Sequence, residues 1–208
     1  MNFDTGRFIL KIAETSEELH AAQRLRYKVF VEEMGANVAD DCHASRMEYD
    51  KFDQDFDHLI LIDSLNRNTA ENVVGVYRLM LNTSVNKNRG FYSSSEYNLD
   101  KLIKADRKIL ELGRSCIDKQ HRGGVALHMM WNGLAQYVID NNVEVLFGVA
   151  SFHGVDINLI NHALSYLHYN HLAPVELRPI AIGENKIDMN ILNKSDVEKI
   201  FRSAFINL

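Results

Sequence analysis

A glutamate and an arginine lie three residues apart in the segment KILELGRSCI, where apolar alternation predicts a strand over residues 108–117. A carboxylate in a closed pocket can take up a proton as a general base. A guanidinium can bind a carboxylate through two parallel hydrogen bonds. Glu111 and Arg114 are therefore our candidate catalytic residues, with Glu111 as the base. A structural ion pair is the alternative interpretation of each side chain.

The spacing of these two residues sets a condition on the strand. Successive side chains of a regular strand point to opposite faces of a sheet, so Glu111 and Arg114 would point away from each other. Gly113 lies between them, and a glycine permits a β-bulge that re-aims a side chain. We therefore predict a bulge at Gly113 that brings both charged groups to one cleft.

A glycine-containing turn follows this strand and leads into a predicted helix. The N-terminus of a helix favours phosphate, because its first N–H groups are unpaired and the helix dipole is positive there. We assign a phosphate to the backbone amides of Arg122, Gly123, Gly124 and Val125. Strand and turn together indicate transfer of a group from a phosphate-containing carrier. A plain strand-to-helix turn is the alternative.

The rest of the chain also alternates between strands and helices. Predicted strands lie at 7–13, 58–63, 71–81, 108–117, 143–151 and 175–182. Predicted helices lie at 16–34, 98–105, 124–141 and 156–169, with a last one capped by Ser195. Thr15 and Glu18 form a capping box for the first helix, and Asp156 caps the fourth. The strand at 143–151 is apolar enough to be buried on both faces.

The order of these elements predicts the fold class. Strands that alternate with helices favour an α/β fold with a mixed sheet and helices on both faces. Residues 36–57 and 83–98 are predicted to be loops. Because no segment resembles a linker, we expect a single domain over residues 1–208.

Composition excludes several classes of function. The chain has 208 residues and a formal net charge of -5, and its Lys and Arg are spread thinly, so we expect no nucleic-acid partner. Apolar runs are too short to cross a bilayer, so we expect a cytoplasmic protein with at most peripheral contact with the inner membrane. Its 2 cysteines form no CxxC pair, and the histidines lack ligand spacing, so we predict no metal site.

Seven blocks of the sequence, in order, resemble the ornithine N-alpha-acyltransferases, a branch of the GNAT-like acyltransferases. The blocks are LRYKVFVEEMG (25–35), FDHLILID (56–63), VVGVYRLM (73–80), GFYSSSEYNL (90–99), ELGRSCI (111–117), LFGVASFHGVD (146–156) and ALSYLHYNHLAP (163–174). The resemblance implies a GNAT-like mixed sheet and transfer of a fatty acyl group, typically 3-hydroxyacyl, to the α-amine of L-ornithine. That is the first step of ornithine-lipid synthesis. It also implies acyl carrier protein as partner, its acyl-phosphopantetheine as donor, and no tightly bound cofactor.

A more distant similarity to acyl-homoserine-lactone synthases indicates which residues bind substrate. It runs through Arg26, Phe30, Asp50, Asp53, Arg78, Glu111 and Arg114. We assign the first five of these residues, together with His153, to substrate binding. Scaffolding salt bridges between the arginines and the aspartates are the alternative.

Ornithine carries a second, distal amine that a selective site has to recognise. A carboxylate of the acidic segment is expected to hold it. The candidates are Asp50, Asp53, Asp55 and Asp57. A solvated loop is the alternative interpretation of this segment.

Two features depart from the pattern of the family. Val125 and Leu127 replace glycines that most GNAT enzymes have in the turn, which favours a carrier-protein donor over acetyl-CoA. The chain stops at Leu208, where the family continues into its last strands, so we expect a C-terminally truncated chain that lacks those strands. Two other functions stay open: an enzyme similar to acyl-homoserine-lactone synthases, and a non-catalytic carrier-binding remnant.

Overall fold

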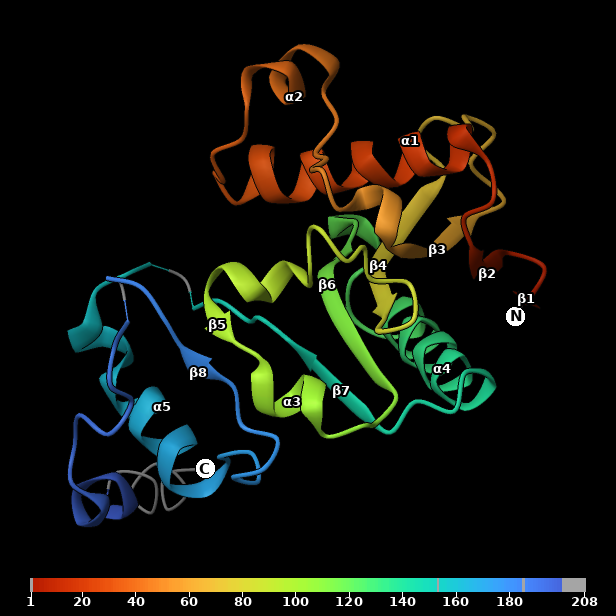
Figure 1. Ribbon diagram of the computed structural model, residues 1–208. Coiled ribbons are helices and arrows are strands. Elements are labelled where there is room, and N and C mark those ends of the chain that lie inside the picture. The colour runs from red at the N-terminus through yellow and green to blue at the C-terminus, as the bar shows by residue number, and fades with distance from the viewer. Residues whose placement is uncertain (1, 153, 185, 200–208) are drawn as a thin grey trace. The chain divides into compact units, whose positions relative to one another are not determined.

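The computed structural model describes residues 2–152, 154–184 and 186–199 (Figure 1). Contacts within the chain divide it into two compact units. The first comprises residues 1–92 and 107–149, and the second comprises residues 93–106 and 150–208. The single domain expected from the sequence stays a prediction. Within the described ranges, no helix has both the length and the apolar character of a membrane span.

The first unit is built on a six-stranded sheet. Its strands are β1 (Asn2–Asp4), β2 (Phe8–Ile12), β3 (Asp57–Asp63), β4 (Val73–Leu81), β6 (Ile109–Ile117) and β7 (Val145–Gly148). They lie in the order β1-β2-β3-β4-β6-β7, and all neighbours are antiparallel except β6 and β7, which are parallel. The predicted mixed sheet is therefore confirmed, with β1 as an additional strand.

One long helical segment covers one face of this sheet. The predicted capping box is present, with reciprocal hydrogen bonds between Thr15 and Glu18, and α1 (Ser16–Arg26) follows it. The segment continues as a π-helix, η1 (Tyr27–Glu33), so the predicted helix over 16–34 is confirmed with a wider hydrogen-bond spacing in its second half. The core on this face consists of residues from the helical segment and from the strands beneath it. The helical residues are Ala21, Ala22, Leu25 and Val29, and the strand residues are Ile60, Val73, Val76 and Cys116.

The helix α4 (Val125–Asp140) covers the opposite face, as Figure 1 shows. Gly133 lies against the sheet, where an added Cβ would come within 2.6 Å of Leu10 Cδ2. The absence of a side chain at this position lets the helix approach the strands closely. The core on this face includes residues of the sheet and of α4. The sheet residues are Leu10, Leu59, Leu61, Val74, Leu79 and Leu110, and the α4 residues are Met129, Met130 and Leu134. Helices on both faces of the sheet are thus confirmed.

The strand β7 lies at an edge of the sheet, and within the described residues it pairs with β6 alone. Its residues are alternately half-buried and exposed, and Leu146 is 43% exposed. The predicted strand over 143–151, buried on both faces, is therefore too long and its burial is wrong. A short apolar run does not reveal whether a strand has one neighbour or two.

The segment over 36–57, predicted to be a loop, is partly helical. The short helical elements of the first unit are α2 (Asp40–Ser45), η2 (Asp53–Asp55) and η4 (Lys119–His121). Two polar contacts hold the α2 segment against η1. The Tyr27 hydroxyl lies 3.0 Å from His43 Nδ1, and Arg46 forms an ion pair with Glu32. These contacts anchor α2 beside the first helical segment.

The second unit is smaller and carries most of the remaining elements. These are η3 (Tyr92–Ser95), which begins at the unit boundary, β5 (Tyr97–Asn98), α3 (Asp100–Lys104), α5 (Ile157–Asn170) and β8 (Ile180–Ala181). Asp156 caps α5 as predicted, since its side chain accepts a hydrogen bond from the Asn158 N–H. The predicted strand over 175–182 is reduced to β8, which pairs with β5. Helical backbone over 194–199 begins one residue before Ser195, so Ser195 is not its cap.

We expect Gly148→Ala to lower the free energy of unfolding by about 2 kcal/mol, the usual cost of overpacking a filled position. A Cβ at residue 148 would lie 2.4 Å from the carbonyl oxygen of Leu112, which is backbone and cannot rotate away. Gly113→Ala is the matched control, because its Cβ would meet only Arg78 side-chain atoms, at 3.9 Å or more. Urea unfolding measures the free energy of unfolding of both variants. Equal stability of the two would contradict the close approach of β7 to β6.

Candidate active site

The strand β6 contains a bulge, as predicted, but one residue further along. Two of its residues, Arg114 and Ser115, lie opposite the single residue Tyr77 of β4. Arg114 has a φ of 51°, the left-handed conformation that glycine usually supplies in such a bulge. The predicted bulge is therefore confirmed, and the prediction that Gly113 forms it is wrong.

The bulge changes which residues of β6 share a face. Before it, Leu110 and Leu112 pack in the core under α4, so Glu111 points to the face that α1 covers. After it, Cys116 packs under α1, which regular alternation would not allow. Arg114, at the bulge itself, reaches carboxylates on this same face. The two catalytic candidates are thus on one face of the sheet.

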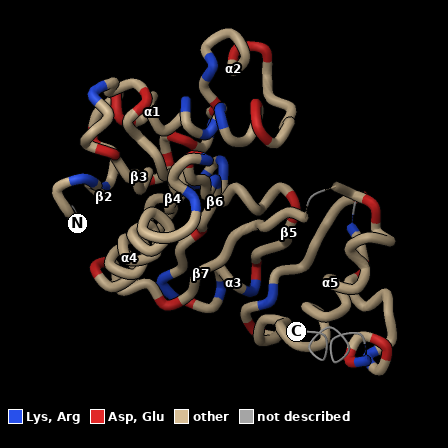
Figure 2. The backbone as a smooth tube through the Cα atoms, turned by 180° about the vertical axis from the view of Figure 1, so that it is seen from behind, with Lys and Arg blue, Asp and Glu red and all other residues tan. Residues whose placement is uncertain are grey.

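Three arginines and three carboxylates form a largely buried group of ion pairs under α1. They are Arg26, Arg78, Arg114, Glu48, Asp50 and Asp53, and we call them the arginine cluster. Figure 2 shows charged positions of both signs close together near α1, α2, β4 and β6. Arg26 and Arg78 are both 0% exposed. Because a buried ion loses several kcal/mol of hydration, each of them requires an opposite charge beside it.

Asp53 joins the two buried arginines. Its Oδ1 lies 2.9 Å from Arg26 Nη1 and 2.7 Å from Arg78 Nη1, and Gln23 donates to its Oδ2 at 2.9 Å. Burial alone would raise the pKa of Asp53, but Arg26 and Arg78 outweigh it and hold that pKa below its ordinary value. Because the folded-state pKa is lowered, Asp53 stabilises the fold above about pH 4 and loses this contribution as the pH falls through the folded-state pKa.

Glu48 and Asp50 connect the buried arginines to Arg114. Glu48 lies 2.5 Å from Arg26 and 3.0 Å from Arg114. Asp50 lies 2.9 Å from Arg78 and 3.5 Å from Arg114. Burial opposes the charge of Arg114, but Glu48 and Tyr92 together raise its pKa above the ordinary value. The arginines therefore make the scaffolding salt bridges that the sequence left as an alternative.

Glu111 lies beside the arginine cluster and is 1% exposed. Its carboxylate accepts a hydrogen bond of 2.8 Å from the backbone N–H of Tyr92. The Tyr92 hydroxyl in turn accepts a 3.4 Å hydrogen bond from Arg114, and the Arg114 guanidinium lies 5.0 Å from the centre of the Tyr92 ring. Tyr92 thus contacts both catalytic candidates.

Two cavities lie in the first unit. The larger has a volume of about 670 Å³ and is lined by residues of α1, β3, β4 and η4. The smaller has a volume of about 460 Å³, and its lining includes Asp41, Glu48, Asp50, Lys51 and Arg114. Glu111 is absent from the described lining of both cavities. The smaller cavity therefore meets the arginine cluster, and Tyr92, which contacts both Arg114 and Glu111, connects the cluster to Glu111.

The turn before α4 has an open backbone. Gly123 and Gly124 have φ values of 85° and 128°, and an added Cβ at either would meet no atom within 4 Å among the described residues. Gly124 precedes the first turn of α4 without a side-chain cap, which leaves N–H groups there for a ligand. Arg122 is paired with Glu33 at 2.5 and 2.7 Å, and Val125 is 62% exposed.

Two predicted substrate-binding residues lie outside the arginine cluster. Phe30 is half-buried in η1 and packs against the core under α1. His153 lies outside the described residues. The structure therefore brings four of the six predicted residues together, and it does so through salt bridges.

The carboxylates expected to hold a distal amine all have partners in the structure. Asp50 and Asp53 belong to the arginine cluster. Asp55 binds Arg89 through two hydrogen bonds of 2.7 and 2.6 Å, and Asp57 accepts a 2.6 Å hydrogen bond from a tyrosine hydroxyl. All four side chains therefore already make polar contacts within the fold.

Sequence reasoning missed three residues of this site: Gln23, Glu48 and Tyr92. Glu48 lies two residues before Asp50 in the same acidic segment, and Tyr92 lies in the block GFYSSSEYNL. Their partners are distant in sequence, since 66 positions separate Glu48 from Arg114. Only the folded sheet brings them together.

Comparison with known proteins places the chain in a family. The profile of the acetyltransferase (GNAT) domain matches residues 25–132, and the chain belongs to this family. It is 44% identical over 181 residues to the L-ornithine N(alpha)-acyltransferase of Rhodobacter capsulatus, which is 86% of this chain and 70% of that protein. Within the GNAT family, the chain belongs to the L-ornithine N(alpha)-acyltransferases.

Two further comparisons were found. The protein of the same name from Agrobacterium fabrum is 33% identical over 190 residues, 90% of this chain and 65% of that protein. The chain thus spans 65–70% of the length of these two relatives. Among solved structures, the AHL synthase LasI aligns with a TM-score of 0.48 and 19% identity, over 70% of this chain and 74% of that chain.

We expect Asp53→Asn to lower the free energy of unfolding by about 3 kcal/mol at neutral pH, because it leaves two buried arginines without their shared counter-charge. The difference from the unmodified protein should begin to shrink below about pH 4, where this aspartate becomes protonated in the unfolded chain, and should be lost as the pH falls through its lowered folded-state pKa.

Urea unfolding at a series of pH values measures this difference. Glu14→Gln is the control, because Glu14 is 75% exposed in its pair with Lys11 and should contribute at most about 0.5 kcal/mol. A difference that stays constant throughout the acid range would contradict the assigned role of Asp53.

Proposed function

We propose that this chain transfers a fatty acyl group, typically 3-hydroxyacyl, from acyl carrier protein to the α-amine of L-ornithine. The product is lyso-ornithine lipid, and the reaction is the first step of ornithine-lipid biosynthesis. The 44% identity to the L-ornithine N(alpha)-acyltransferase of Rhodobacter capsulatus carries this proposal. The enzyme would act in the cytoplasm, with at most peripheral contact with the inner membrane.

The turn before α4 supports a donor that carries a phosphate. Gly123 and Gly124 carry no side chains and have positive φ values that favour glycine, so a phosphate can approach the N–H groups of residues 122–125. The dipole of α4 favours a negative charge at this end. The phosphopantetheine arm of a carrier protein has such a phosphate, and binding it here would hold the thioester in a fixed direction.

Glu111 is the proposed proton acceptor. An amine attacks only as the neutral form, because an ammonium has no lone pair. Since Glu111 is 1% exposed and contacts the Tyr92 backbone, the proton would travel through a water or follow a shift of the Tyr92 segment. The amine nitrogen then bonds to the thioester carbon and the carbon–sulfur bond breaks. The departing thiolate takes up the proton held by Glu111, and the second proton that the nitrogen loses on becoming an amide is released to water.

Arg114 is the arginine of the cluster that we propose to contact substrate. Its side chain is 26% exposed and lines the smaller cavity, whereas Arg26 and Arg78 are inaccessible. Arg114 can therefore meet a carboxylate or carbonyl oxygen of a ligand. The other cluster residues act by holding Arg114 and the strands in position.

We expect Glu111→Gln to reduce turnover with ornithine by about 100-fold or more while the fold is kept, because the amide cannot accept a proton. Release of free thiol from an acyl carrier protein thioester measures turnover. Glu71→Gln, at an exposed glutamate, is the control. Near-normal turnover of Glu111→Gln would remove Glu111 as the base, and thiol release that requires S-adenosylmethionine instead of ornithine would reject the proposed acceptor.

We expect Gly123→Ala to raise the KM for the acyl carrier protein about tenfold with a smaller change in kcat, since a Cβ would distort the turn proposed to hold the phosphate. Gly6→Ala is matched for backbone strain, because Gly6 has a φ of 84° in a turn between β1 and β2. Steady-state kinetics with varied carrier concentration compare the two. Equal KM values would contradict the assignment of the turn.

A further inference from the structure

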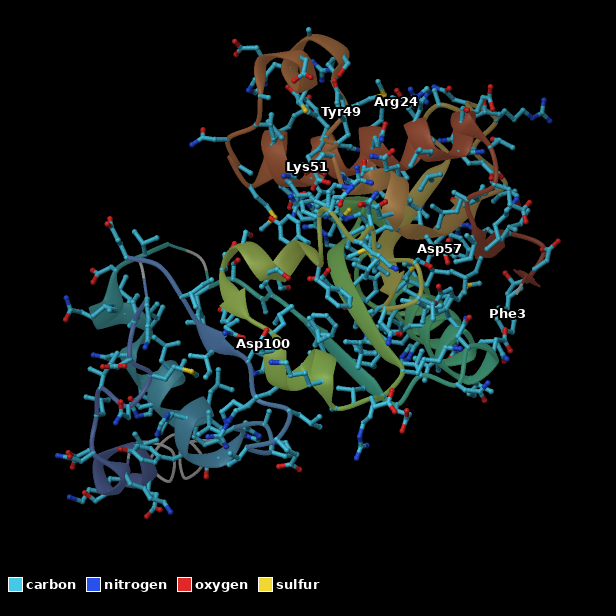
Figure 3. The ribbon with its side chains drawn as sticks, viewed as in Figure 1. Phe3, Arg24, Tyr49, Lys51, Asp57 and Asp100 are labelled. Carbon is cyan, nitrogen blue, oxygen red and sulfur yellow. The ribbon has the colours of Figure 1, made fainter. Side chains whose placement is uncertain are left out.

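The smaller cavity lies under α2 and is built from two parts of the first unit. Residues from 38 to 51 form one side of it, and Arg114 at the β6 bulge forms the other. Figure 3 shows Tyr49 and Lys51 on the segment that follows α2, between this helix and the sheet. The cavity therefore opens beside the arginine that we propose to contact substrate.

Most charges that line the cavity are neutralised within the protein. Glu48, Asp50 and Arg114 belong to the arginine cluster and pair with one another. Their charges largely balance one another, although the guanidinium of Arg114 remains partly exposed to the cavity.

Asp41 is the carboxylate of this lining without a cationic partner among the described residues. Its Oδ1 accepts a 2.9 Å hydrogen bond from the Cys42 N–H, and its Oδ2 accepts a 2.8 Å hydrogen bond from the Tyr49 hydroxyl. Both donors are neutral, so they orient the carboxylate and leave its charge unbalanced. The same contact raises the pKa of Tyr49, which keeps the hydroxyl protonated as a donor.

Lys51 is the corresponding cation. Within the described part of the chain it forms no ion pair, and its Nζ lies 5.3 Å from the centre of the Phe52 ring. The cavity therefore presents one unbalanced negative charge and one unbalanced positive charge. A ligand that carries both signs of charge fits this pattern.

We propose that this cavity binds the amino-acid acceptor, with Asp41 holding the distal ammonium and Lys51 holding the α-carboxylate. The inference rests on the proposed function and names the residue that selects a diamino acid. Asp50, Asp53 and Asp55 are paired with arginines, and Asp57 does not line the cavity, which leaves Asp41 to recognise a second amine. The α-amine, which neither charge engages, remains for acyl transfer.

The kinetic test compares L-ornithine with L-norvaline, which has the same carbon skeleton without the distal amine. Asp41→Asn should raise the KM for ornithine about fivefold, the order expected of an exposed ion pair, with little change in kcat and none in the kcat/KM for norvaline. Lys51→Met should raise the KM for both amino acids alike, because both carry the α-carboxylate. Asp40→Asn, which changes the adjacent carboxylate of α2 that does not line the cavity, should change neither.

Isothermal titration of the full chain with each amino acid, without donor, separates this inference from the proposed reaction. The unmodified protein should bind ornithine more tightly than norvaline. Loss of this preference in Asp41→Asn, with its retention in Asp40→Asn, would support the site even if no acyl group is transferred. Such a result without turnover would reject the proposed function alone. An Asp41→Asn variant with unaltered preference for ornithine, or with equal losses for both amino acids, would overturn the assignment of Asp41.

Discussion

Arg26 and Arg78 lie inside the first unit without contact with solvent, and their positive charges have to be balanced where they lie. Asp53 forms ion pairs with both, and Glu48 forms ion pairs with Arg26 and Arg114. Because these residues come from α1, the acidic segment, β4 and β6, the requirement for neutrality fixes four parts of the chain against one another. Apolar packing alone would not specify this arrangement, since many apolar side chains can exchange places with little loss.

The same constraint shapes the site. The acidic segment has to enter the protein to reach the arginines, and this places the smaller cavity between α2 and the bulge of β6. The bulge then presents Arg114 to the cavity on one side and to Tyr92 on the other. Charge balance in the core, the position of Tyr92 and the burial of Glu111 are therefore parts of one structural arrangement.

Periodicity and capping signals predicted most of the elements, because local preferences and the fold agree there. The Thr15 capping box, the helix that becomes α4 and the strand β6 are examples. The bulge could be predicted from the need to bring two charged groups together, but its position could not, since Gly113 looks the more suitable residue. The edge position of β7 and the role of Glu48 depend on neighbours distant in sequence, which a linear pattern does not reveal.

The left-handed conformation of Arg114 has a consequence for how this protein can change. A non-glycine residue there holds a backbone conformation that costs about 1–2 kcal/mol, a strain that glycine would relieve. Glycine would keep the bulge but remove the guanidinium from the cavity and from Tyr92. It would also leave the buried carboxylate of Glu48 with one arginine partner fewer. Backbone strain and charge balance therefore oppose each other at this position, and a substitution that relieves the first disturbs the second.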